Sequence, residues 1–137
     1  CENCHNFQTN VYKGMYLDKN QPDFMKEGGV GCIDCHVISD KVVKPDTKVC
    51  LKCHSAGYDE QMIDWKKDVS NLINDANAQL DKAKNKSLTE EQRDEVKEIR
   101  KIVNQISGYP SIYVHNYDLI STVLNGKIKK LKDINKE

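Results

Sequence analysis

Apolar residues follow two different patterns along this chain of 137 residues. From residue 58 onward they recur at intervals of three and four among Lys, Asp, Glu, Asn and Gln, which is the spacing of one face of an amphipathic helix. Before that point glycines and prolines punctuate the sequence and no long stripe is present. The pattern predicts an all-α protein, in which an N-terminal segment with little regular structure beyond short helical turns precedes a bundle of about three long helices.

Local signals place the ends of the three predicted helices. Residues 85–88 interrupt the first helix, and Thr89-Glu-Glu-Gln92 is a capping box that opens the second. Gly108-Tyr109-Pro110 ends the second helix, and Asn116 is the expected N-cap of the third. The three stripes, expected to form a core or an oligomer interface, are Met62, Trp65, Val69, Leu72, Ile73, Ala76, Leu80 and Ala83; Val96, Ile99, Val103 and Ile106; and Leu119, Ile120, Val123, Leu124, Ile128 and Leu131.

Composition removes several classes of function. Twenty-one basic residues balance twenty-one acidic ones, which argues against a nucleic-acid-binding surface, because phosphate binding needs uncompensated Lys and Arg. No stretch approaches the roughly 18 apolar residues of a membrane-spanning helix. The mean hydropathy of -0.71 and a low aromatic content of 7% are thin for a self-sufficient core. We therefore expect something other than side chains to supply apolar mass.

All six cysteines fall into three copies of one motif. The copies read Cys1-Glu-Asn-Cys4-His5, Cys32-Ile-Asp-Cys35-His36 and Cys50-Leu-Lys-Cys53-His54. This C-x-x-C-H pattern is the attachment signature of c-type haem. Two thiols three residues apart can each add across one vinyl group of the same porphyrin, and the histidine that follows can ligate the iron.

A redox dithiol, a four-cysteine zinc site and a disulfide framework are the alternatives. None of them explains why a histidine follows every pair and why no cysteine lies outside a pair. The sequence therefore predicts three covalently bound haem c groups with iron, which consume all the thiols as thioethers. Attachment of this kind implies a periplasmic or extracellular location. A chain that begins on Cys1 is expected to be a fragment of a longer multihaem protein or to lack residues at its N-terminus.

Axial ligands are in short supply. His5, His36 and His54 each provide one axial ligand. His115 is the only further histidine, so we expect it to be the second axial ligand of one iron. For the remaining positions the sequence leaves several candidates open: Met15, Met25, Met62, a lysine or tyrosine, a histidine of a neighbouring chain, or an open site. Two histidines usually give a low-potential electron carrier, whereas a methionine opposite histidine raises the potential.

The order of these motifs resembles the C-terminal part of the pentahaem ammonia-forming nitrite reductases, whose core the octahaem cytochromes share. Gly29-Val-Gly-Cys32, the third C-x-x-C-H, the long helices and Val114-His115-Asn116 carry the resemblance over nearly the whole chain. The resemblance implies that His115 pairs with His36. It also implies that the distal ligand of the His54 haem comes from position 25, where this chain has Met25 instead of the family's histidine.

The resemblance also shows what this chain lacks. The distal ligand of the His5 haem would come from a segment before Cys1, so that Met15 or a neighbouring subunit's histidine would have to replace it. The family's catalytic haem, attached through a motif that ends in lysine, lies upstream, and its substrate-pocket residues have no convincing counterparts. Tyr117 stands where the family often has proline.

Together these observations favour an electron-transfer protein over an enzyme. Residues 1–56 would carry the three haems, and residues 57–137 would form a helical scaffold that supplies one distal ligand. The predicted function is a relay of electrons between redox partner proteins, with homo-oligomers formed through the long helices or through ligation of a haem by a neighbouring subunit. The alternative is a part of a multihaem oxidoreductase that acts on a small nitrogen or sulfur compound.

Overall fold

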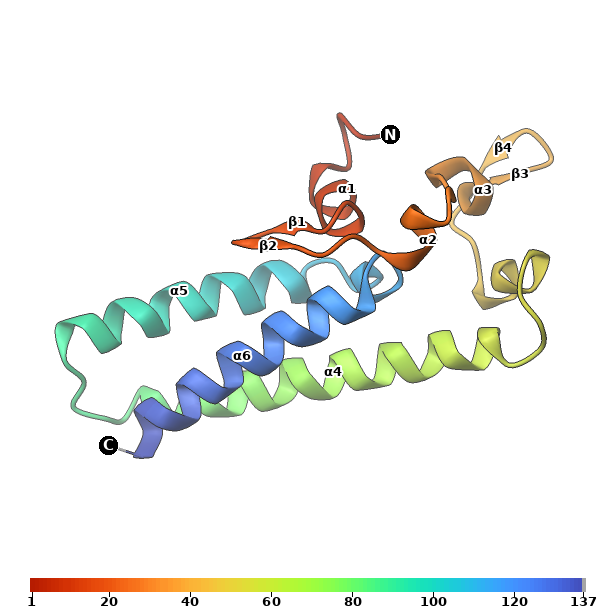
Figure 1. Ribbon diagram of the computed structural model, residues 1–137. Coiled ribbons are helices and arrows are strands. Elements are labelled where there is room, and N and C mark those ends of the chain that lie inside the picture. Colours follow the sequence, from red (N-terminus) through yellow and green to blue (C-terminus); the bar gives the residue numbers. More distant parts are fainter. Residues whose placement is uncertain (137) are drawn as a thin grey trace.

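The computed structural model describes residues 1–136 and is built mainly of helices (Figure 1). The predicted unit 57–137 thus ends one residue outside the described chain. In chain order the elements are α1 (Asn6–Tyr12), β1 (Met15–Tyr16), β2 (Lys19–Asn20), α2 (Phe24–Glu27), α3 (Cys32–His36), β3 (Val37–Ile38), β4 (Lys41–Val42), the 3-10 helix η1 (Thr47–Lys52), α4 (Tyr58–Ala83), α5 (Glu90–Ser107), the 3-10 helix η2 (Ile112–Val114) and α6 (Tyr117–Lys136).

The three long helices form the bundle that the periodicity predicts. Helix α4 runs away from the cysteine motifs, α5 returns, and α6 runs away again, with its main contact along α4 (Figure 1). Nearly all members of the predicted stripes are buried or partly buried here, and all six of the third stripe are buried. Ile102, also buried, extends the predicted stripe of α5.

The predicted helix ends are confirmed. The Thr89 hydroxyl accepts from the Gln92 backbone N–H at 3.2 Å, and the Gln92 side chain accepts from the Thr89 N–H at 3.0 Å. Helix α5 ends at Ser107, directly before Gly108-Tyr109-Pro110. These bonds satisfy backbone donors that a helix end leaves without intrahelical partners.

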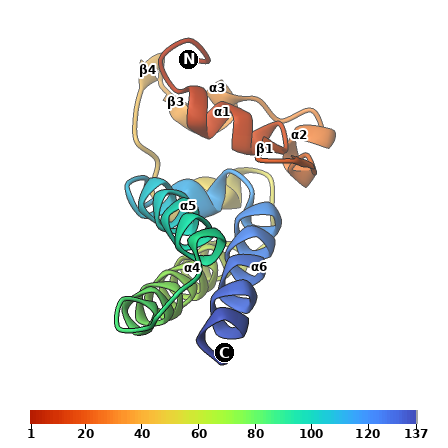
Figure 2. The ribbon, with the colours of Figure 1, turned by 90° about the vertical axis from the view of Figure 1, so that its left-hand side faces the viewer.

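The elements α1 to β4 form a layer over one end of the bundle, whereas η1 packs against α4 (Figure 2). Short helices lie at or beside the cysteine motifs, as expected, but two antiparallel hairpins, β1–β2 and β3–β4, also form. The expectation of an all-α chain therefore holds only roughly. The strands are two residues long, too short for an alternating pattern, and the second hairpin turns through Ser39 and Asp40 with φ of 49° and 61°. Positive φ at both central residues is the geometry of a tight hairpin turn.

Gly14 fixes the turn that leads from α1 into the first hairpin. Its φ is +79°, and an added Cβ would lie 2.2 Å from the Gln21 carbonyl carbon. Because the obstacle is backbone and not a flexible side chain, no other residue fits this position without moving the chain. The close approach brings the segment that follows the hairpin back against the end of α1.

Asn116 joins the N-terminal layer to the bundle. Its side chain is 1% exposed, and its oxygen accepts from the Leu119 N–H at 3.0 Å, which confirms the predicted N-cap of α6. The amide nitrogen donates to the carbonyls of Val11 at 3.0 Å and Gln21 at 2.7 Å. One side chain thus starts the last helix and holds helix α1 and the segment after β2 against it.

Replacement of Asn116 tests this junction. Asn116→Asp keeps the cap acceptor but cannot donate to the two carbonyls, whereas Asn116→Ala loses all three bonds. We expect both variants to lose about 2–4 kcal/mol of unfolding free energy, measured by denaturant titration followed by circular dichroism. Asn104→Ala, at an exposed position of α5, is the control and should change stability by less than about 0.5 kcal/mol. An Asp variant as stable as the parent would show that only the cap matters.

Candidate haem-binding site

The three cysteine motifs adopt the same helical turn. The His5 N–H donates to the Cys1 carbonyl and the His54 N–H to the Cys50 carbonyl, both at 2.9 Å, and the second motif is helix α3 itself. A turn of this kind places the two cysteines and the histidine of a motif on neighbouring positions of one helical surface. Each motif can therefore present two sulfurs and one imidazole to the same flat group.

The thiols themselves are available. All six cysteines are free, and Cys1, Cys4, Cys32 and Cys53 are exposed while Cys35 and Cys50 are half-buried. Within residues 1–136, no three side chains of His, Cys, Asp or Glu are grouped so that they could hold a bare metal ion. The cysteines are thus spread over three separate turns instead of meeting in one cluster.

Two of the predicted iron ligands lie close together with nearly parallel rings. His36 ends α3, and His115 lies between η2 and α6. Their ring centroids are 6.3 Å apart, and the ring planes differ by 17°. The structure therefore brings together, from positions 79 residues apart, the pair that the resemblance implies.

Backbone carbonyls fix both of these rings. Nδ1 of His36 lies 3.0 Å from the Val43 carbonyl, and Nδ1 of His115 lies 3.1 Å from the Ser111 carbonyl. A carbonyl can only accept, so each Nδ1 carries the proton and Nε2 is the nitrogen with a lone pair. Histidines that bind metals usually donate their other nitrogen in this way, which sets the ring orientation and raises the basicity of the ligand.

The spacing of the two rings fits a shared metal ion. An imidazole nitrogen binds a transition metal at about 2.0–2.1 Å, and the centroid of a five-membered ring lies about 1.1 Å behind that nitrogen. Two imidazoles on opposite sides of one ion would therefore have centroids about 6.2–6.4 Å apart. The observed 6.3 Å falls in this range.

The protonation of His115 suits the same role. Burial lowers the pKa of its imidazole, the hydrogen bond to Ser111 acts in the opposite direction, and the nearby charges of His36 and His5 lower it further. The folded state therefore favours the neutral ring, which is the form that ligates a metal. The influence of His5 also places the first motif near this pair.

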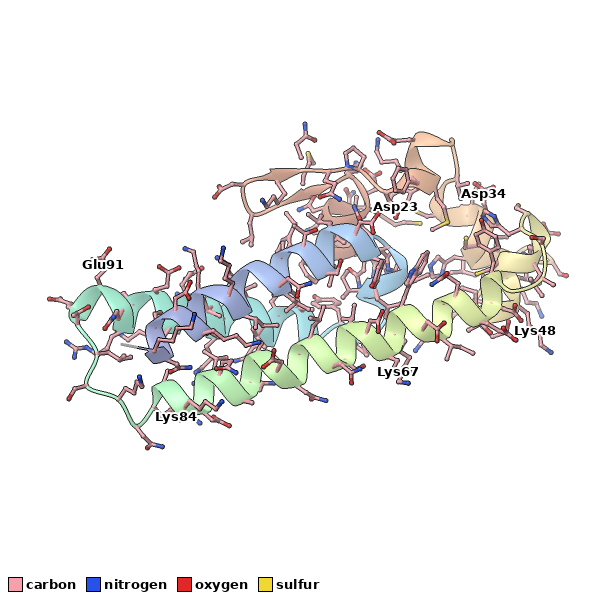
Figure 3. All side chains as sticks on the ribbon, turned by 60° about the horizontal axis from the view of Figure 1, so that its bottom comes forward. Asp23, Asp34, Lys48, Lys67, Lys84 and Glu91 are labelled. Carbon is pink, nitrogen blue, oxygen red and sulfur yellow. The ribbon has the colours of Figure 1, made fainter. Side chains whose placement is uncertain are left out.

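The third motif lies beside the second. Burial raises the pKa of the Cys35 thiol, and Cys50, Asp34 and Cys53 raise it further, whereas Lys52 lowers it. These interactions join side chains of α3 to side chains of η1 and the residue after it. Figure 3 shows Asp34 of the second motif and Lys48 of η1 at the same end of the molecule, opposite Lys84 and Glu91.

The three methionines have different surroundings. Met15 is exposed in β1, and Met25 is half-buried on α2, where its backbone N–H donates to the Asp23 carboxylate at 2.9 Å. Met62 is buried, and its sulfur lies 3.7 Å from the Cys50 sulfur. Met62 is thus the methionine that contacts the third motif in the structure, and the assignment of Met25 to the His54 haem stays a prediction.

Large apolar side chains are left exposed around the motifs. Of the ten that are exposed, only Ile63 and Tyr109 lie outside residues 1–58. Phe24 is 76% exposed and Val42 is 85% exposed. Conversely, only Val11 and Tyr16 of this segment are among the buried apolar residues. A segment with so little core of its own and so much exposed apolar surface fits one that packs around large flat apolar groups.

Sequence reasoning did not identify the residues that orient the ligands. The Val43 carbonyl reaches His36 only because the β3–β4 hairpin folds back, and two-residue strands leave no pattern to detect. Ser111 lies four residues before His115, which is the spacing of a helical turn, but its role is played by a carbonyl that every residue possesses. Tyr58, which stacks on His54, could have been noticed from the same spacing of four.

Comparison with known proteins gives no further assignment. No protein-family model, no curated protein and no solved structure matches this chain significantly. The likeness to the pentahaem and octahaem cytochromes therefore rests on the motifs alone. Among residues 1–136 none of the helices has both the length and the apolar character of a bilayer-spanning helix.

Removal of the His115 ring tests the facing pair. In a protein that carries its haems, His115→Gly should turn one low-spin haem into a high-spin haem, because the iron bound by His36 loses its second ligand. Added imidazole should enter the vacated space and restore the low-spin signal, measured by electron paramagnetic resonance and visible absorption. An unchanged spectrum in the variant would remove His115 from the set of ligands.

Proposed function

We propose that this chain is a multihaem c-type cytochrome that relays electrons between redox partner proteins. The observation that carries the proposal is the facing pair of His36 and His115, each with Nδ1 bonded to a carbonyl and with ring centroids 6.3 Å apart. Both histidines are half-buried, and the carbonyl at each Nδ1 orients the ring as in a metal-binding histidine. When bound, haem iron supplies one-electron transfer between its ferric and ferrous states.

Each motif would hold its group through its own residues. Cys1 and Cys4, Cys32 and Cys35, and Cys50 and Cys53 would form the thioether links, and His5, His36 and His54 would provide the proximal ligands. His115 would complete the coordination at His36. The electrostatic influence of Cys50 and Cys53 on Cys35, and of His5 on His115, supports three sites close enough for electrons to pass among them.

The helical bundle would act as a scaffold that positions the distal ligand His115. It places His115 through η2 and α6, and its exposed faces carry ion pairs between the helices. Lys130 pairs with Glu95 of α5 at 2.6 Å, and Lys132 pairs with Asp75 of α4 at 2.9 Å, so α6 is bound to both neighbours at its outer end. Such exposed pairs add little stability individually.

Covalent attachment of haem to C-x-x-C-H motifs supports a periplasmic or extracellular site of action. There the partners would be a donor and an acceptor protein, and a neighbouring copy of the chain could supply a ligand to the His5 iron. Residues 1–137 contain four histidines for three proposed irons, so at most one iron can have two histidine ligands from within these residues. The alternative, an open iron that acts on a small nitrogen or sulfur compound, depends on what fills the remaining positions.

Binding of small ligands distinguishes the relay from the enzyme. For a relay we expect three low-spin haems in the reduced protein, with no spectral change when carbon monoxide, nitrite or hydroxylamine is added, because every iron has two protein ligands. Visible absorption of the reduced protein with and without each compound measures this. A high-spin fraction that binds these molecules would contradict the relay and favour a part of an oxidoreductase.

A further inference from the structure

The histidine of the third motif is held differently from the facing pair. The ring of Tyr58 lies parallel to the His54 ring, with centroids 4.2 Å apart and planes 18° apart. Among residues 1–136 neither nitrogen of His54 bonds to a backbone carbonyl, in contrast to His36 and His115. An aromatic ring, and not a hydrogen bond, therefore limits the orientation of this imidazole.

The backbone fixes Tyr58 in this position. Gly57 has a φ of +103° and reverses the chain, so that α4 begins at Tyr58, four residues after His54. One turn later, buried Met62 contacts the Cys50 sulfur at 3.7 Å and so attaches the start of α4 to the same motif. Tyr58 itself is 47% exposed, which means that its ring contributes little to the core of the bundle.

Stacking in this position has an electronic consequence. The Tyr58 ring covers one face of the His54 imidazole and keeps water from that face, whereas the rest of this histidine is exposed. Water stabilises the more positively charged oxidised iron, so a covered ligand favours the reduced state. A hydrogen bond to a carbonyl makes an imidazole a stronger donor to oxidised iron and so lowers the reduction potential. Because His54 has no carbonyl partner among the described residues, this lowering is absent.

We infer that Tyr58 is a positioning residue for His54, which fixes the plane of this imidazole and, by covering one of its faces, raises the reduction potential of the iron bound there. The inference rests on the proposed function, because it needs a haem at the third motif. It goes further in naming a residue outside the C-x-x-C-H motifs that sets the potential of one iron.

Three variants of the haem-loaded protein test the role of Tyr58. Tyr58→Ala removes the ring, Tyr58→Phe keeps it, and Ile63→Ala, at another exposed apolar position of α4, is the control. Potentiometric titration followed by visible absorption resolves the three one-electron steps. Electron paramagnetic resonance reports the orientation of the axial imidazoles. Intact mass shows that each variant carries its haems.

In Tyr58→Ala we expect one step to move to lower potential, with a change of about threefold to tenfold in its redox equilibrium constant; tenfold corresponds to about 59 mV for one electron. The signal of the same haem should change its anisotropy, and Tyr58→Phe should retain both parent values. The step that moves should differ from the one that His115→Gly alters.

Several results would overturn the inference. They are an unchanged or raised potential in Tyr58→Ala, an equal shift in Ile63→Ala, or movement of the step that belongs to His115. If instead the parent protein has no haem at the third motif, the proposed function fails as well, and the intact mass separates that outcome from a failure of the role of Tyr58 alone.

Discussion

His115 and Asn116 are neighbours in the chain whose side chains serve two different parts of the protein. The ring of His115 faces His36 at 6.3 Å, and the amide of Asn116 holds the carbonyls of Val11 and Gln21 while capping α6. The position of one candidate iron ligand therefore depends on the buried bonds of the next residue. Because α6 is packed along α4, the bundle sets how far His115 can move relative to the cysteine motifs.

The distribution of apolar surface between the bundle and residues 1–56 supports the same interpretation. The bundle buries its own stripes and needs no further group to form a core, whereas residues 1–56 bury little and expose large apolar side chains around the motifs. Burial of apolar surface is the main stabilising contribution to folding. A layer that lacks it is stable only if something else covers that surface, and three macrocycles would do so at the positions where the C-x-x-C-H turns present their sulfurs.

Much of this organisation could be predicted from the sequence because the relevant signals are local. The stripes of the three helices, the Thr89–Gln92 capping box and the cap at Asn116 each depend on residues within a few positions of one another. The cysteine motifs are equally local. The hairpins and the carbonyls of Val43 and Ser111 were missed because they involve strands of two residues or backbone atoms that no residue type marks. The two bonds from Asn116 to the N-terminal layer span about a hundred residues, and spacing alone does not reveal such contacts.

The central claim is that three turns of this chain each bind one haem covalently, and the mass of the intact protein tests it most directly. The chain should be produced in a host that attaches c-type haem, purified under denaturing conditions and weighed by mass spectrometry. The account predicts the 15.7 kDa polypeptide plus three haem groups that remain after denaturation, together with visible absorption of ferrous haem c after reduction. A colourless product with the mass of the polypeptide alone would contradict it.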